Sequence, residues 1–387
     1  MTLRHDPWRV LFPLGVLLAW AGVLEWLLYA VGATAEYRAV FHATAQIQGF
    51  MTCLAVGFLY TFVPRRTAAA EPTHLQLAVA AAAPVAATLA ALDGRVALAQ
   101  ALWGAGLLNV AVFVSRRVLG RAGLRGLPGV FVWVPAGLAA AVIGAVLVAV
   151  AAVLGPAEEP ELWRLGRGLL LQGFLTALVV GVGGTMIPVL TRGPGAAAPA
   201  AGSASGRAAQ TIAAALFLAS FPLEAYLAPR AGLALRGVIS GAVLVSEARL
   251  WRPPSIPGLH RWLIWSSAWL LPAGYLAAAA APEPRSTALH VVFVGGFALM
   301  ALSVSLHVAL SHAGRPDALA SSPWQVRAMA GLLLVALASR LLAGVDAARS
   351  RPWLGLASGA FLLATVAWGS LVGAAVRAAA KSREASA

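Results

Sequence analysis

The chain has 387 residues, of which 60% are hydrophobic and 11% are charged, and its formal net charge is +14. A soluble domain of this length needs more charged surface, so the composition excludes a soluble enzyme and indicates a polytopic membrane protein. The arginines lie mostly in short segments between apolar runs, which is typical of topology signals and excludes nucleic acid as the expected partner. The expected partner of this surface is the lipid bilayer.

Long apolar runs without period-two alternation favour helices over a barrel, because only these two structures satisfy their backbone in lipid. We predict an all-α polytopic membrane protein with a single integral membrane domain over residues 1–387. The segment 191–207, which is rich in Gly, Ala, Ser and Pro, is predicted to be a flexible linker. The twelve predicted spans are Trp8–Gly32, His42–Val63, Leu75–Leu92, Val96–Val114, Val130–Leu154, Gly168–Leu190, Ala208–Leu227, Leu233–Ser246, Arg261–Ala281, Leu289–His312, Val326–Gly344 and Trp353–Val376.

Arginine is concentrated at the two termini and in the loops after even-numbered spans, whereas the remaining loops hold acidic groups such as Glu158, Glu159 and Glu161. Positive residues stay on the cytoplasmic side of a membrane. Both termini are therefore predicted to be cytoplasmic, in a bacterial inner membrane.

An internal repeat of 124 residues links the second and sixth spans. Gln48-Gly49-Phe50 and Val63-Pro64 in the second span correspond to Gln172-Gly173-Phe174 and Ile187-Pro188 in the sixth. A further 124 residues lead to Gly296-Phe297 in the tenth span, and twice 124 separates His42 from His290. The pattern predicts three pseudo-repeated four-helix units, roughly 1–125, 126–250 and 251–387, with spans 2, 6 and 10 as equivalent central helices.

His42 and His290 are predicted to lie at the same depth near the outer face, because spans 2 and 10 both enter from that side. His307 follows His290 by 17 residues, or about 25 Å at 1.5 Å per residue, so these two cannot bind one metal ion. Other polar side chains of the spans that are expected near the outer level are Glu25, Gln46, Gln48, Gln172, Glu224 and Arg340.

Intramembrane ionisable side chains usually serve an ion, a proton or a cofactor. Two axial imidazoles, amides that orient them and an arginine near the propionates would make a b-type haem site. The expected iron ligands are His42 and His290, with His307 and His312 as weaker metal-ligand candidates. The alternative is that His42 and His290 are interfacial residues that hydrogen-bond a loop.

Several motifs resemble the NnrS family of haem- and copper-containing membrane proteins linked to nitric oxide metabolism. The family's W-H-A-H-E-M-x-x-G motif is similar to residues 41–49, F-H-A-T-A-Q-I-Q-G, and its G-H-T-G-R-P motif is similar to residues 311–316, S-H-A-G-R-P. Gly183-Gly184-Thr185-Met186-Ile187-Pro188 resembles its G-G-R-x-x-P turn. Thr44 stands where the family's second histidine is expected, so a copper-binding set that needs both histidines is incomplete here.

The twelve spans also resemble, more distantly, the haem–copper oxidase catalytic subunit, whose low-spin haem lies between histidines of its second and tenth helices. The resemblances imply a haem-binding membrane protein in nitric oxide handling or electron transfer, with a quinol or a cytochrome as electron donor. Two alternatives stay open. One is an enzyme resembling an oxidase or a nitric oxide reductase, and the other is a cofactor-free, proton-coupled transporter in which Glu25 and Glu224 carry protons.

Overall fold

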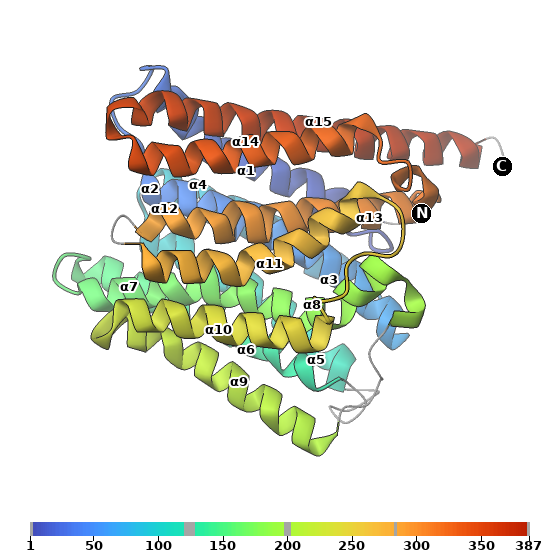
Figure 1. The fold of residues 1–387 in the computed structure, drawn as a ribbon, viewed down its shortest axis with the longest axis horizontal. Helices are drawn as coiled ribbons and strands as arrows, with labels where there is room; N and C mark the ends of the chain where they lie inside the picture. The colour runs from blue at the N-terminus through green and yellow to red at the C-terminus, as the bar shows by residue number, and fades with distance from the viewer. Residues whose placement is uncertain (1–2, 120–127, 197–202, 282–284, 385–387) are drawn as a thin grey trace.

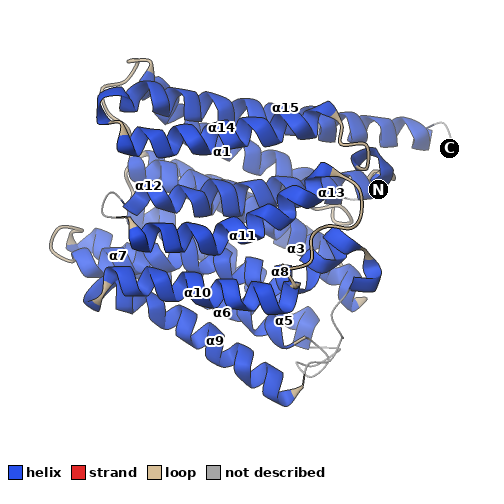
Figure 2. Ribbon diagram, in the orientation of Figure 1, coloured by secondary structure: helices blue, strands red, loops and turns tan. Residues whose placement is uncertain are grey.

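The computed structural model describes residues 3–119, 128–196, 203–281 and 285–384, and within these ranges it contains helices and no strand. Twelve helical segments of this described part are long and apolar enough to cross a membrane. The long helices run side by side in one bundle (Figure 1), and only loops and turns connect them (Figure 2). The predicted all-helical membrane fold is therefore confirmed.

The first six spans are α1 (Trp8–Ala30); α2, η1 and α3 (Ala39–Ala43, Thr44–Met51, Thr52–Thr67); α4 (His74–Leu92); α5 (Val96–Leu119); η3 and α6 (Gly129–Val132, Trp133–Leu154); and α7, η4 and α8 (Pro160–Gly168, Leu169–Gly173, Phe174–Arg192). The second six are α9 and η6 (Ala204–Pro222, Leu223–Leu227); α10 (Pro229–Ala248); α11 (Leu259–Ala280); α12, η7 and α13 (Arg285–His290, Val291–Ala298, Leu299–His312); α14 (Trp324–Val345); and η9 and α15 (Ala347–Arg349, Ser350–Glu384).

Some spans begin earlier than the sequence suggests, because a local signal starts the helix. Pro160 and Pro229 stand in the first turn of α7 and α10, where the missing N–H costs nothing. Ser203 caps α9 by accepting a hydrogen bond of 3.0 Å from the Gly206 N–H. Helices α8 and α9 thus extend into both ends of the predicted linker 191–207, whose residues 197–202 lie outside the described part.

Spans 2, 6 and 10 form the centre of the bundle, as predicted. In their most apolar stretches 83, 72 and 67% of the residues are buried, against 28 to 44% in the other nine described spans. Each of the three also contains a π-helical segment, η1, η4 or η7, and a fourth such segment, η6, ends the seventh span. Such segments are rare in proteins and frequent at functional sites. Their shared occurrence agrees with an equivalence of the central helices, while the division into three four-helix units stays a prediction.

Both chain termini lie at one end of the bundle, and α2, α7 and α12 lie at the other (Figure 1). The last span closes the bundle against the first, since α15 packs on both α1 and α14. A hydrogen bond of 2.8 Å from Trp20 Nε1 to Thr365 Oγ1 joins α1 to α15. The end with α2 and α12 contains the two histidines that the sequence singles out.

Candidate cofactor site

A cavity of about 320 Å³ lies between the three central spans, and side chains of α1, α14 and α15 complete its wall. Its volume falls in the range of small-molecule pockets. The cavity brings together four of the predicted site residues: His42, His290, Gln46 and Arg340. Aromatic rings of Trp26, Tyr37, Phe293 and Phe361 also line it.

His42 is oriented by the backbone of α1. Its Nδ1 lies 3.0 Å from the Gly22 carbonyl oxygen, which can only accept, so Nδ1 carries the proton. Gly22 also allows this close approach, because a Cβ there would fall 2.7 Å from the Ala45 Cβ. The Trp26 ring meets the imidazole edge-on at 5.5 Å between centroids. These contacts leave Nε2 of His42 with a lone pair and no partner among the described residues.

His290 has the same arrangement on α12. Its Nδ1 donates to the Ser286 carbonyl oxygen at 2.7 Å, one helical turn earlier. Phe293 meets the imidazole edge-on at 5.8 Å. Nε2 is again the ring nitrogen without a partner in the described part of the chain. A hydrogen bond from Nδ1–H to a backbone carbonyl is the arrangement that orients metal-binding histidines in proteins. Both rings are therefore oriented so that Nε2 could bind a metal.

Two arginines line the same cavity, Arg167 from α7 and Arg340 from α14. Arg167 lies over the Trp163 ring, with 5.5 Å from Cζ to the ring centroid. Neither guanidinium has a carboxylate or hydrogen-bond acceptor among the described residues. An unneutralised charge is costly at membrane depth. Two such groups give the cavity a positively charged wall, which would suit a negatively charged occupant.

Gln46 donates from Nε2 to the Ala19 carbonyl oxygen at 2.8 Å, which fixes its amide at the cavity wall. Glu25 lies outside the cavity and forms an ion pair with Arg38. The Glu25 carboxylate also accepts the Arg38 backbone N–H at 2.8 Å. The side-chain hydrogen bond from Arg38 Nε to Glu25 Oε1, at 2.8 Å, raises the pKa of the Arg38 guanidinium. Glu25 thus joins α1 to Arg38, the residue that precedes α2.

The two other predicted glutamines lie in separate polar contacts. Gln48 and Gln100 exchange two amide hydrogen bonds of 2.8 and 3.2 Å. Gln172 accepts from Arg236 Nη1 at 2.6 Å, and Arg236 Nη2 donates to Glu224 at 2.7 Å. The Arg236 side chain is fully buried and also lies over the Phe221 ring. This cluster pairs Glu224 with Arg236 of α10.

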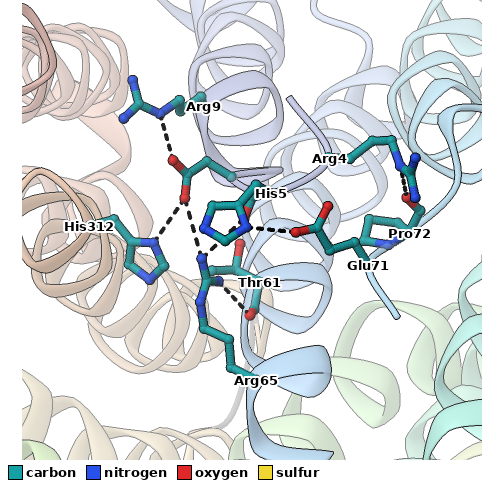
Figure 3. Close-up of polar contacts among 9 residues, drawn as sticks. Arg4, His5, Arg9, Thr61, Arg65, Glu71, Pro72 and His312 are labelled. Carbon is teal, nitrogen blue, oxygen red and sulfur yellow. Dashed lines mark hydrogen bonds and ion pairs between the residues drawn. The ribbon is translucent and has the colours of Figure 1, made fainter. Parts of the chain in front are cut away.

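The other histidines do not form one group. His307 packs against His260, with nearly parallel rings 5.7 Å apart. His312 donates from Nδ1 to Asp6 Oδ1 at 3.0 Å, and His5 lies 2.6 Å from Glu71 Oε1. Figure 3 shows His5, His312, Arg9 and Arg65 with their dashed contacts near the N-terminus. The contacts of His5 and His312 are hydrogen bonds to carboxylates, and they lie in a different region from the cavity.

Sequence reasoning missed Arg167 as a cavity residue and Arg236 as the partner of Gln172. Arg236 had a readable signal, because it lies inside the predicted span Leu233–Ser246, whereas Arg167 stands one residue before the predicted span Gly168–Leu190. Within the described residues, no group of three or more His, Cys, Asp or Glu side chains could hold a metal ion. The cavity instead offers two imidazoles and two cations, a donor set that fits an iron porphyrin with carboxylate side chains.

No curated protein shows significant similarity to this chain. A family model described as NnrS protein matches residues 2–378, which is nearly the whole sequence. This match agrees with the resemblance carried by residues 41–49 and 311–316. The chain therefore belongs to the NnrS family.

Proposed function

We propose that the cavity between the central spans binds a b-type haem through Nε2 of His42 and Nε2 of His290. The observation that carries this proposal is the matched orientation of the two rings, each of which donates from Nδ1 to a backbone carbonyl and lines the same cavity. Arg167 and Arg340 supply the positive charge that two propionates require. The aromatic rings of the wall would cover the porphyrin faces and edges.

Bound haem would supply one-electron chemistry and an affinity for diatomic ligands. The protein's own residues hold the imidazoles in one tautomer, neutralise the propionates and surround the site with apolar side chains. With His42 and His290 both bound to the iron, the protein would be suited to electron transfer or slow binding of nitric oxide. We infer a role in nitric oxide or nitrosative-stress handling in a bacterial cytoplasmic membrane, with a quinol or a cytochrome as electron donor.

The structure favours this reading over a proton-coupled transporter. That alternative needs buried carboxylates that change their protonation, but Glu25 is paired with Arg38 and Glu224 with Arg236. A reductase-like enzyme would need a second metal beside the iron, and Thr44 and Gln172 stand where its ligands would be expected.

The optical spectrum of detergent-purified protein tests the haem proposal. Reduced protein should show a six-coordinate b-type spectrum, with one haem per chain by pyridine haemochrome assay. His42→Ala and His290→Ala should each lose the haem or turn it high-spin. His74→Ala, at the exposed start of α4, is the matched control and should keep the parent spectrum. Unchanged spectra in both ligand variants would overturn the assignment.

Turnover distinguishes electron transfer from catalysis. Reduced protein of known metal content should consume nitric oxide anaerobically only up to about one equivalent per haem. Sustained consumption over many turnovers, with copper or non-haem iron near one equivalent, would mean that the protein is an enzyme with a second metal site.

A further inference from the structure

A second cavity, of about 130 Å³, lies between the same three central spans and one residue of α1, Phe12. It continues the histidine cavity along the axis of the bundle. On the second span, Met51 lines both cavities. On the sixth span, Leu171 lines the first cavity and Leu175, one turn later, lines the second. On the tenth span, Ala298 lines the first cavity and its neighbour Phe297 lines the second. The two spaces are therefore neighbours on all three helices, and they meet at the π-helical segments.

Each central helix lines this second cavity with five residues at the same spacing along the chain. The second span contributes Met51, Leu54, Ala55, Phe58 and Leu59, with spacings of 3, 1, 3 and 1 residues. The sixth span repeats these spacings from Leu175 to Gly183, and the tenth repeats them from Phe297 to Ser305. Such spacing places the five side chains of each helix on one face. Three matching faces thus surround a single axial space.

The wall of this cavity offers no free polar group within the described structure. Ser305 is the one hydroxyl-bearing residue that lines it, and its Oγ donates to the Leu302 carbonyl and accepts from Trp368 Nε1 at 2.9 Å. Enclosed apolar cavities of about this size stay dry and bind small apolar molecules such as xenon, and the lining here offers such molecules the same apolar contacts. Water, ions and polar metabolites would lose hydrogen bonds on entering.

We propose that this cavity is a binding site for small neutral apolar molecules of the size of a diatomic gas, and that it leads them to the histidine cavity. The first part depends only on the volume and the lining. The second part rests on the proposed haem at His42 and His290, because a gas needs a reactive centre at the end of its path. Met51 stands at the junction of the two cavities.

Xenon tests the first part without reference to haem. Crystals pressurised with xenon, or ¹²⁹Xe NMR of detergent-purified protein, should show xenon between Ala55, Val179 and Ala301. Ala301→Phe should fill the space and abolish this binding, and Ala55→Leu is a smaller second filling variant. The matched control Ala338→Phe, at an exposed position of α14, should leave xenon binding unchanged. Absence of xenon from the parent cavity, or an ordered acyl chain there, would overturn the proposal.

Ligand kinetics test the second part. In reduced, haem-loaded protein, carbon monoxide association is measured at low gas concentration, where entry of the gas and not loss of a histidine limits the rate. Ala301→Phe should slow this association several-fold with an unchanged haem spectrum, and Ala338→Phe should keep the parent rate. An unchanged association rate together with lost xenon binding would overturn the path while keeping the site. Protein without haem that still binds xenon would mean that the haem proposal has failed and the gas site has not.

Discussion

His312 Nδ1 lies 3.0 Å from Asp6 Oδ1 and joins the end of α13 to the segment before α1, across 306 residues of sequence. Asp6 also accepts from Arg9 Nε at 3.1 Å and lies 3.5 Å from Arg65 Nη2. Its side chain is only 2% exposed. One carboxylate thus connects spans 1, 2 and 10 at the end of the bundle that holds both termini.

Stability should depend on pH through this carboxylate. Burial alone would raise the pKa of Asp6, but the hydrogen bonds and charges of His312 and Arg9 hold it well below its ordinary value of 3.8. A lowered pKa in the folded state stabilises the protein above pH 4, and this contribution is lost as the pH falls further. Asp6→Asn should therefore cost about 1–3 kcal/mol at pH 7 and progressively less below pH 4.

Thermal unfolding in detergent between pH 3 and pH 7 measures this dependence. Glu71→Gln is the matched control, because the His5–Glu71 pair is exposed and should contribute little. The interpretation fails if Asp6→Asn equals the parent at pH 7, or if the difference grows on acidification.

A Gly22→Ala variant should disturb the orientation of His42. The added methyl would fall 2.7 Å from the Ala45 Cβ and 2.9 Å from Gln46 Nε2, so α1 must move away from the Gly22–His42 hydrogen bond. We expect a haem spectrum that is partly high-spin, read by absorption and electron paramagnetic resonance. Gly331→Ala, which meets nothing within 4 Å, should be silent. Gly22→Ala with Ala45→Gly should recover much of the parent spectrum, and no recovery would contradict a steric cause.

Arg340→Gln and Arg167→Gln should each weaken haem retention. A charge-assisted hydrogen bond to a propionate is worth about 1.5–3 kcal/mol, or roughly 10–100-fold in affinity. Transfer of haem to an excess of apomyoglobin gives the dissociation rate, which should rise by about this factor. Arg351→Gln, whose guanidinium lies over the Tyr29 ring, is the control. Equal rates in all variants would show that the cavity arginines do not contact the haem.

The cluster of Arg236, Gln172 and Glu224 should contribute to stability rather than to haem binding. Glu224→Gln leaves a buried guanidinium without its carboxylate and should cost about 3–5 kcal/mol. Arg236→Met together with Glu224→Gln should cost less than the single change, because no buried charge remains unpaired. Unfolding temperatures of the two variants give the comparison. Haem content per folded chain should stay at the parent value in both.

Reporter fusions measure the orientation of the chain in the membrane. A reporter fused after Arg252 should be found on the cytoplasmic side, and a reporter fused after Glu159 should be found on the outer side. The structure already requires opposite sides for these two loops, since the sixth, seventh and eighth spans separate them. The reverse pattern would place the histidine cavity toward the cytoplasm and change the expected electron donor.

The twelve spans, the central position of spans 2, 6 and 10, and a shared cavity for His42 and His290 could all be predicted from sequence. The length of the apolar runs predicts the spans, and the repeated motifs predict which helices are central. Rotation of each helix about its axis is not encoded in this way, so Gln48 and Gln172 were expected near the histidines and lie elsewhere. The residues that line the second cavity are offset by 124 residues between spans 2 and 6 and by 122 residues between spans 6 and 10. By these offsets position 42 corresponds to position 288, two residues before His290.

The π-helical segments have a consequence for the length of the chain. A π segment holds one residue more than an α-helix would at that point, so removal of one residue from η1 or η7 can restore a regular helix without breaking the span. Because the wider turn takes up the extra residue, the helix on either side would keep its rotation, and His42 or His290 would still face the cavity. One codon lost inside such a segment would thus remove the π-helical turn beside a ligand and leave that ligand in the cavity.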